Sequence, residues 1–225
     1  LADAGIQPEC VAGHSIGELA ALAAAGCIST AEAIRLSDER GRAMAEEAPP
    51  GAMAAILALD IPTVKAICEQ ASDENSSVQV ANDNCPGQVV ISGDETALTR
   101  AMTLAEEAKA RKVVKLPITI AAHSRLMASA AEAFARAVDA TPIQAPTVPV
   151  IANVTAQPLT TPDQIRDELK AQLTSGVAWT DSMNYLLAQG VDTFVEVGPG
   201  DTLLSFMKRI DRKASRVKLT FGENL

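Results

Sequence analysis

A serine lies between two glycines where a short apolar segment gives way to an Ala-rich one. Gly13-His14-Ser15-Ile16-Gly17 fits the pattern G-x-S-x-G, with Val11 and Ala12 before it and an expected helix over 16–25. This pattern is typical of a nucleophile elbow, a sharp turn that lifts a serine hydroxyl above a sheet. Because the two glycines have no Cβ, the helix can pass close to the strand. The alternative is a tight turn in which the serine only caps the helix.

An elbow serine needs a base, since a hydroxyl is a weak nucleophile at neutral pH. In such a turn the Ile16 N–H and the helix N-terminus face a developing oxyanion. The chain has only two histidines. Neighbouring side chains on an elbow diverge, so His14 is poorly placed to act on Ser15, which leaves His123. The alternative for a lone histidine is a structural or surface role.

Two further segments allow two interpretations each. Arg40 precedes Gly41 inside an expected helix over 31–48 that Ser29 or Thr30 caps. A helical glycine costs about 1 kcal/mol against alanine, so Gly41 is expected to admit another element at close range. The alternative is a surface arginine that pairs with nearby carboxylates.

Gly198-Pro199-Gly200 either cradles a phosphate at a helix N-terminus or forms a plain turn, and it lacks the Lys-Ser/Thr of a P-loop.

The middle of the chain has its own order of elements. After Pro49-Pro50-Gly51, the pattern predicts strand, helix, strand, strand, helix and strand between residues 52 and 121. That order is typical of a ferredoxin-like unit. We expect strands at 53–59, 78–81, 88–92 and 112–116, and helices at 63–71 and 96–109. The domains would then be 1–51 with 122–225, and an inserted subdomain of 52–121.

The remaining residues alternate between helices and strands, which predicts an α/β fold. Residues 1–5 are expected to end a helix, which indicates further sequence upstream. We expect helices at 124–140, 162–173, 179–189 and 201–210, and strands at 148–154, 193–197 and 217–221.

Composition excludes several classes of protein. The 225 residues carry a net charge of −9 and 3% aromatics, which argues against nucleic-acid binding. The longest apolar run, residues 19–28, is too short to span a bilayer. The four cysteines form no CxxC pair, so we expect reduced, mostly buried thiols, no metal site and no cofactor.

These residues together resemble one family. Gly13-His14-Ser15-Ile16-Gly17-Glu18, Arg40-Gly41 with Met44, His123 with Leu126-Met127, and Glu196-Val197-Gly198-Pro199-Gly200 occur in its order and spacing. The chain resembles malonyl-CoA:acyl-carrier-protein transacylases and the related acyltransferase domains of fatty-acid and polyketide synthases. The resemblance implies an α/β-hydrolase-like large domain with a short parallel sheet and an inserted ferredoxin-like subdomain.

The resemblance also implies roles for residues. Ser15 would carry the malonyl group, His123 would act as the base, and the main-chain carbonyl of Gln172 would orient that histidine. Arg40 would bind the malonyl carboxylate through two parallel hydrogen bonds, a geometry that suits guanidinium. The other expected substrate-site residues are His14, Ile16, Asn84 and Asn153.

Partners follow from the same resemblance. The donor would be malonyl-CoA and the acceptor an acyl carrier protein, bound by four basic residues: Arg111, Lys112, Lys208 and Arg209. Ordinary surface charge is the alternative for these. A Gly-Gln-Gly-Ser-Gln segment that supplies a second oxyanion donor is expected upstream of Leu1. We expect a cytoplasmic monomer that takes part in lipid metabolism and binds neither nucleic acid nor membrane.

Two other functions fit parts of the pattern. A serine esterase or thioesterase would favour water over the carrier thiol, and a carboxylate beside His123 would support it. A main-chain carbonyl there would favour the transferase. A non-catalytic relative that only binds a carrier would form no acyl-enzyme.

Overall fold

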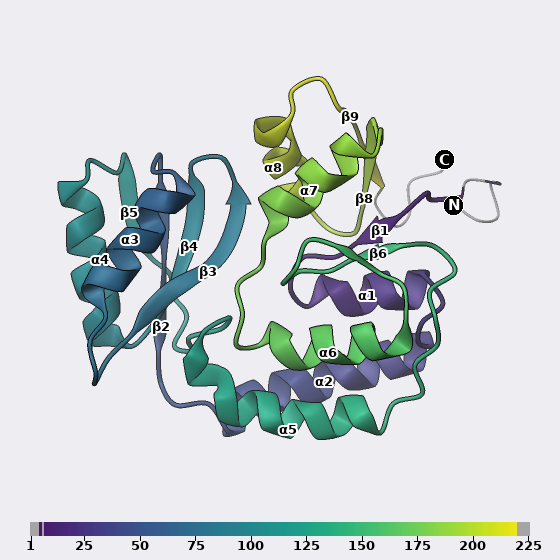
Figure 1. Cartoon of the computed structure of the whole chain (residues 1–225), viewed down its shortest axis with the longest axis horizontal. Helices are drawn as coiled ribbons and strands as arrows, with labels where there is room; N and C mark the ends of the chain where they lie inside the picture. The colour runs from purple at the N-terminus through teal and green to yellow at the C-terminus, as the bar shows by residue number, and fades with distance from the viewer. Residues whose placement is uncertain (1–4, 6, 220–225) are drawn as a thin grey trace.

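The computed structural model describes residue 5 and residues 7–219, and its fold is α/β with mixed sheets. Figure 1 shows three groups of elements: a sheet with two helices on the left, a layer of helices at the lower right, and a smaller group above that layer. The expected end of a helix at residues 1–5 lies almost wholly outside the described residues.

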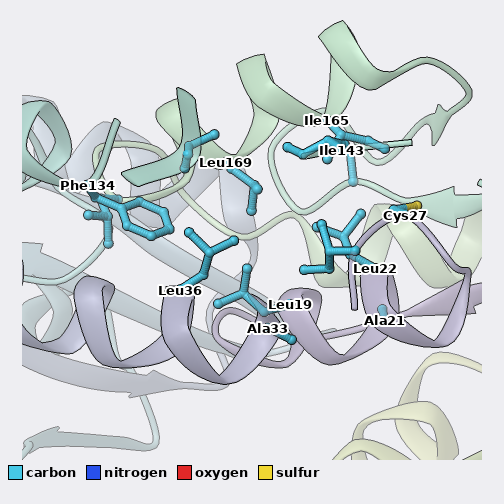
Figure 2. Packing of buried hydrophobic residues seen from close by; sticks show 14 of the residues in the cluster. Leu19, Ala21, Leu22, Cys27, Ala33, Leu36, Phe134, Ile143, Ile165 and Leu169 are labelled. Carbon is cyan, nitrogen blue, oxygen red and sulfur yellow. The ribbon is translucent and has the colours of Figure 1, made fainter. Parts of the chain in front are cut away.

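The helical layer holds the largest apolar core. Its helices are α1 (Gly17–Ala24), α2 (Thr30–Glu46), α5 (Ala128–Asp139) and α6 (Pro162–Gln172). Apolar side chains from all four lie against one another: Figure 2 shows Leu19, Leu36 and Leu169, with Phe134 of α5 beside them. The expected cap of α2 is confirmed, since Ser29 forms a capping box with Glu32. The first residues of the expected helix 124–140 form a short 3-10 turn, η2 (Arg125–Met127).

The expected short parallel sheet is wrong in part. β1 (Val11–Ala12) pairs in parallel with β6 (Val150–Ile151), but β7 (Pro158–Leu159) joins β6 antiparallel. The strand expected at 148–154 is therefore shorter. Ala152 donates its N–H to Gln157 in the turn toward β7, and Asn153 donates its N–H to a glutamate side chain instead of a neighbouring strand.

The segment from Ala52 to Lys115 contains all six expected elements. They are β2 (Ala52–Leu57), α3 (Ile61–Ala71), β3 (Val78–Cys85), β4 (Gln88–Gly93), α4 (Glu95–Glu107) and β5 (Lys112–Lys115). The strand order is β3-β4-β2-β5, with every pair antiparallel. β3 extends beyond the expected residue 81, because register shifts let its polar Asn-Asp-Asn stretch continue the pairing.

The third group lies beside the tip of β3. It contains α7 (Trp179–Ala188), β8 (Thr193–Val197), α8 (Thr202–Ile210) and β9 (Ser215–Leu219). β8 and β9 form a separate parallel pair. The strand expected at 217–221 thus begins earlier, and its last two residues lie outside the described part of the chain.

Three glycines test the sequence interpretation. A Cβ on Gly13 would lie 1.9 Å from the carbonyl oxygen of Gly17, so α1 packs on β1 only because residue 13 has none. A Cβ on Gly17 or on Gly41 would meet nothing within 4 Å. The expectations that Gly17 permits close packing and that Gly41 admits a neighbouring element are therefore wrong.

We predict that Gly13→Ala destabilises the protein and that Gly17→Ala does not. The first change forces α1 away from β1, and overpacking of this kind costs about 1–3 kcal/mol. The second places a better helix former in open space. Chemical denaturation of both variants measures the free energy of unfolding. Equal losses in the two variants would contradict the close contact.

Candidate active site

Ser15 is held in a strained turn between β1 and α1. Its φ is 52°, in the left-handed region that non-glycine residues rarely adopt. Its Oγ lies 2.7 Å from Nε2 of His123, a residue 108 positions away in the sequence. The strain and the long-range contact together favour the nucleophile elbow over a simple helix cap.

His123 is oriented by main-chain carbonyls. Its Nδ1 lies 2.9 Å from the carbonyl oxygen of Gln172 and 3.1 Å from that of Ser175. Carbonyls only accept, so Nδ1 carries the proton and Nε2 is free to accept the Ser15 hydroxyl. Among the described residues, no carboxylate bonds to Nδ1. The geometry is the one expected of a transferase and differs from an acid-assisted triad.

The end of α6 explains why these carbonyls are available. Gln172 is the last residue of the helix, and the final carbonyls of a helix lack partners within it. The negative end of the helix dipole also stabilises a positive imidazolium. Burial lowers the pKa of His123 to about 4, so the resting imidazole is neutral over the physiological range.

Arg40 reaches the same point from the middle of α2. Its side chain is buried, with Nη2 3.2 Å from Ser15 Oγ and Nε 3.0 Å from Gln172 Oε1. Burial lowers its pKa to about 10, which leaves the guanidinium charged at neutral pH. None of the ion pairs among the described residues involves Arg40. The alternative of a surface arginine is therefore wrong, and a cation without an acidic partner faces the serine.

The three expected polar neighbours take different places. Asn153 accepts the Ser15 N–H on Oδ1 at 2.7 Å and donates Nδ2 to the Gly13 carbonyl at 2.8 Å. His14 turns away from the hydroxyl and bonds Asn84 Oδ1 through Nε2 at 2.8 Å, with its ring against the edge of Trp179. Burial lowers the pKa of His14. Both asparagines thus lie at the site, one beside Ser15 and one beside His14.

One main-chain donor beside Ser15 is open. In the described part of the chain, the Ile16 N–H donates to no protein atom. It lies at the N-terminus of α1, where the positive end of the helix dipole favours negative charge. When Ser15 Oγ attacks a carbonyl group, the negatively charged carbonyl oxygen of the tetrahedral intermediate can accept a hydrogen bond from this N–H.

Sequence analysis missed three residues that support the site. Glu18 lies in the first turn of α1 and is fully buried against Asn153 and Gln172, and Glu168 is buried on α6. Gln79 on β3 donates to the carbonyls of His123 and Thr174, which fixes the turn that carries the histidine. A charged residue inside an apolar helix was the available signal for Glu18.

The expected basic residues do not reach Ser15 but lie near one another. Lys112 pairs with Leu57 at the end of β2, and Arg111 donates its N–H to the Leu57 carbonyl. Arg209 donates to Pro86 O at 2.7 Å in the adjacent β3–β4 turn. Lys208 precedes it on α8 and is exposed. Two clusters that are far apart in the sequence thus lie at the same end of the four-stranded sheet, which we call the basic edge.

The glycines before α8 form a turn and no phosphate site. Glu196 accepts the N–H groups of Leu203 and Leu204, which occupies the start of the helix with the protein's own carboxylate. The plain-turn alternative is thus favoured for Gly198-Pro199-Gly200.

Three other expectations concern the whole chain. The four cysteines are free, three of them buried and Cys10 partly buried. Among the described residues, no group of three or more histidine, cysteine or acidic side chains is arranged to hold a metal ion. Within the same residues, none of the helices combines the length and apolar character needed to cross a membrane.

Comparisons with known proteins agree on one family. The acyl transferase domain family matches residues 1–220. The chain is 40% identical over 225 residues to malonyl CoA-acyl carrier protein transacylase of Bacillus subtilis, which covers 99% of this chain and 71% of that protein. It is 44% identical over 208 residues to the Escherichia coli protein of the same name, covering 92% of this chain and 67% of that one.

Solved structures give the same result. An acyl carrier protein S-malonyltransferase from Vibrio cholerae has a TM-score of 0.94 and 38% identity, with 97% of this chain and 72% of that one covered. A malonyl-transacylase in complex with a type II PKS acyl-carrier protein has a TM-score of 0.92 and 35% identity, with 95% and 70% covered.

We predict that Ser15 stays reactive under mildly acidic conditions. Since burial lowers the pKa of His123 to about 4, the rate of inactivation by a sulfonyl fluoride should fall to half its plateau near that pH. An ordinary histidine would give a midpoint near 6.5. The measurement is the inactivation rate across the pH range, with His123→Ala as the control that lowers the plateau. A midpoint at the ordinary value would contradict the buried, neutral base.

Proposed function

The chain belongs to the acyl transferase domain family, and we propose that it transfers malonyl groups from malonyl-CoA to an acyl carrier protein through Ser15. The observation that carries this proposal is the buried Arg40 guanidinium, 3.2 Å from the Ser15 hydroxyl and in no direct ion pair with an acid among the described residues. A charge of this kind fits an acyl group that itself ends in a carboxylate.

The first half of the reaction loads the serine. Ser15 Oγ attacks the thioester carbonyl while its proton passes to His123 Nε2. The oxyanion of the tetrahedral intermediate lies toward the Ile16 N–H. The carbon–sulfur bond then breaks, His123 returns the proton to the sulfur, and free CoA leaves.

The second half repeats these steps in reverse. The pantetheine thiol of the carrier gives its proton to His123 and attacks the malonyl ester. The carbon–oxygen bond breaks, and the proton returns to Ser15. Main-chain carbonyls orient His123, and no carboxylate of the described residues bonds to its Nδ1, which supports a transferase over an esterase.

Arg40 selects the acyl group. Gln172 anchors its Nε, Nη2 lies at the Ser15 hydroxyl, and Nη1 contacts Met44 Sδ at 3.4 Å, a weak partner that a carboxylate can replace. The two terminal nitrogens can then bind the malonyl carboxylate through two parallel hydrogen bonds. An acetyl group would leave this buried charge unpaired, which disfavours it. The Asn84–His14 pair and Ile16 complete the walls of the proposed substrate site.

In the proposed domain division, one subdomain is inserted into the chain of another domain. We place residues 52–121 in a ferredoxin-like subdomain, and residues 1–51 with 122–225 in a hydrolase-like domain. Two observations support the division: the strand order β3-β4-β2-β5, and the pairing of the two crossing segments, where Gly51 donates its N–H to Thr119 O. His123 directly follows the returning segment, so the base lies where the two domains meet.

The carrier would dock on the basic edge formed by Arg111, Lys112, Lys208 and Arg209. Carrier proteins are acidic, and this chain has a net charge of −9, so association needs a local positive surface. The free cysteines suit a reducing compartment, and we propose a cytoplasmic enzyme that acts as a monomer.

We predict that Ser15→Ala abolishes acyl loading, whereas Arg40→Ala mainly changes which acyl group is loaded. After mixing with malonyl-CoA, intact-protein mass spectrometry should show one malonyl adduct on the parent and none on Ser15→Ala. Arg40→Ala should lower malonyl loading by about 10²–10³-fold, because it removes two charge-assisted hydrogen bonds. It should lower acetyl loading less.

Arg42→Ala is the matched control, since Arg42 lies on the same helix, is exposed and pairs with Glu39. It should load like the parent. A parent protein that hydrolyses malonyl-CoA steadily without a carrier would support an esterase, and carrier binding without any adduct would support the non-catalytic alternative.

We predict that charge reversal at the basic edge affects only the second half-reaction. Arg111→Glu with Lys208→Glu should raise the KM for the carrier about tenfold or more and leave malonyl loading from CoA unchanged. High salt should shrink the difference from the parent, because it screens surface charges. Arg136→Glu, on α5 at the far side of the helical layer in Figure 1, is the control. An unchanged carrier KM would place the docking surface elsewhere.

A further inference from the structure

A carboxylate is buried directly beneath the elbow. Glu18 has no solvent-exposed surface. Its Oε1 accepts the backbone N–H of Asn153 at 3.0 Å and Nδ2 of the same residue at 2.8 Å. Its Oε2 accepts Nε2 of Gln172. The chemical steps proposed above do not use this group, although a buried charge is costly and needs a reason.

The partners of Glu18 lead to both halves of the site. Asn153 bonds the Ser15 N–H, and Gln172 bonds Arg40 Nε through Oε1. A side-chain amide can present either its oxygen or its nitrogen, whereas a carboxylate only accepts. Glu18 therefore forces the nitrogen of each amide toward itself and the oxygen of each toward the active site.

A second buried acid completes the group. Glu168 lies one helical turn before Gln172 on α6, is buried, accepts the Val154 N–H at 2.8 Å and interacts electrostatically with Glu18. Two carboxyl groups in contact cannot both be charged at low cost, so one of them holds a proton. Glu18 receives three N–H donors and Glu168 receives one, and the pair shares one proton and one negative charge.

We propose that Glu18 is a positioning residue of the transfer, whose carboxyl oxygens fix the side-chain amides of Asn153 and Gln172. Through the second amide it holds Arg40 at the serine, so it sets the preference for malonyl over acetyl groups. Glu168 supplies the shared proton that allows a single negative charge to remain buried. This proposal rests on the function proposed above.

The surroundings of the pair favour a shared proton. Burial raises the pKa of both carboxyl groups, and repulsion by Glu168 adds to the effect on Glu18, whose pKa rises to about 8. The cation that faces them is Arg40 from α2, whose attraction to Glu18 partly opposes the effect of burial on the arginine. His123 lies on the other side of Gln172 and is neutral. The site therefore contains one buried cation and one buried anion, joined through an amide.

The test is the ratio of malonyl to acetyl loading in Glu18→Gln. The new amide keeps its oxygen toward Asn153 but points a nitrogen at Gln172, which must turn and withdraw its oxygen from Arg40. We expect the ratio to fall about 10–100-fold, as for a lost hydrogen bond to a charged group. Labelling of Ser15 by a sulfonyl fluoride should fall much less.

A double variant separates positioning from general damage. In the Arg40→Ala background, Glu18→Gln should cause no further fall in the ratio, because its effect passes through Arg40. Glu39→Gln, at a partly exposed position of α2, is the matched control and should behave like the parent. A fall of the same size in both backgrounds, or an unchanged ratio in Glu18→Gln alone, would overturn the proposal.

A second measurement does not need Glu18→Gln to fold or the parent to be a malonyltransferase. The folded pair holds a proton that the unfolded chain releases, so the Tm should fall as the pH rises from 5 toward neutrality. Glu168→Gln mimics the protonated acid, so this slope should become flatter. It should also shift the loading ratio less than Glu18→Gln does. A parent that is never acylated would refute the proposed function, whereas an unchanged slope in Glu168→Gln would refute the carboxyl pair.

Discussion

The last residue of α6 connects every part of the site. The Gln172 carbonyl orients His123, its Oε1 anchors Arg40, and its Nε2 lies against the carbonyl of Ser15. These contacts are possible because the helix ends there, which leaves a carbonyl free while the side chain faces the elbow. A helix one turn longer would consume that carbonyl, and the histidine would need a carboxylate instead.

The four-stranded sheet and the helical layer meet through residues of the same site. His123 follows the segment that returns from the four-stranded sheet, and Gln79 on β3 bonds its carbonyl. Asn84, also on β3, reaches across to His14 beside the nucleophile. A small shift of the sheet against the helical layer would therefore change the distance between serine and base. The paired crossing segments at residues 50–51 and 119–120 restrain such a shift.

Local signals predicted the elements that have strong local rules. The G-x-S-x-G turn, the Ser29 cap and the strand–helix order of residues 52–115 each depend on neighbouring residues, and the structure contains all of them. The elimination of His14 depended only on the geometry of adjacent side chains. Predictions that depended on distant partners were wrong, and some contacts between distant residues were not predicted at all. A Cβ on Gly41 would meet nothing within 4 Å, so no neighbouring element approaches there. Glu196 accepts N–H groups at the start of the helix that follows the turn resembling a phosphate site. The Glu18–Glu168 pair joins helices 150 residues apart, and no local pattern reveals it.

The absence of an acid from the histidine contact has a chemical consequence. A carboxylate at Nδ1 would strengthen the base in both half-reactions, for water as well as for a thiol. Carbonyl dipoles hold the same tautomer but strengthen the histidine less as a base. A thiol is more acidic than water, so a weaker base is enough to deprotonate it. The acidic groups are instead buried at Glu18 and Glu168, and the Gln172 amide separates Glu18 from Arg40. The same network that keeps the base weak thus leaves the arginine free for a substrate carboxylate.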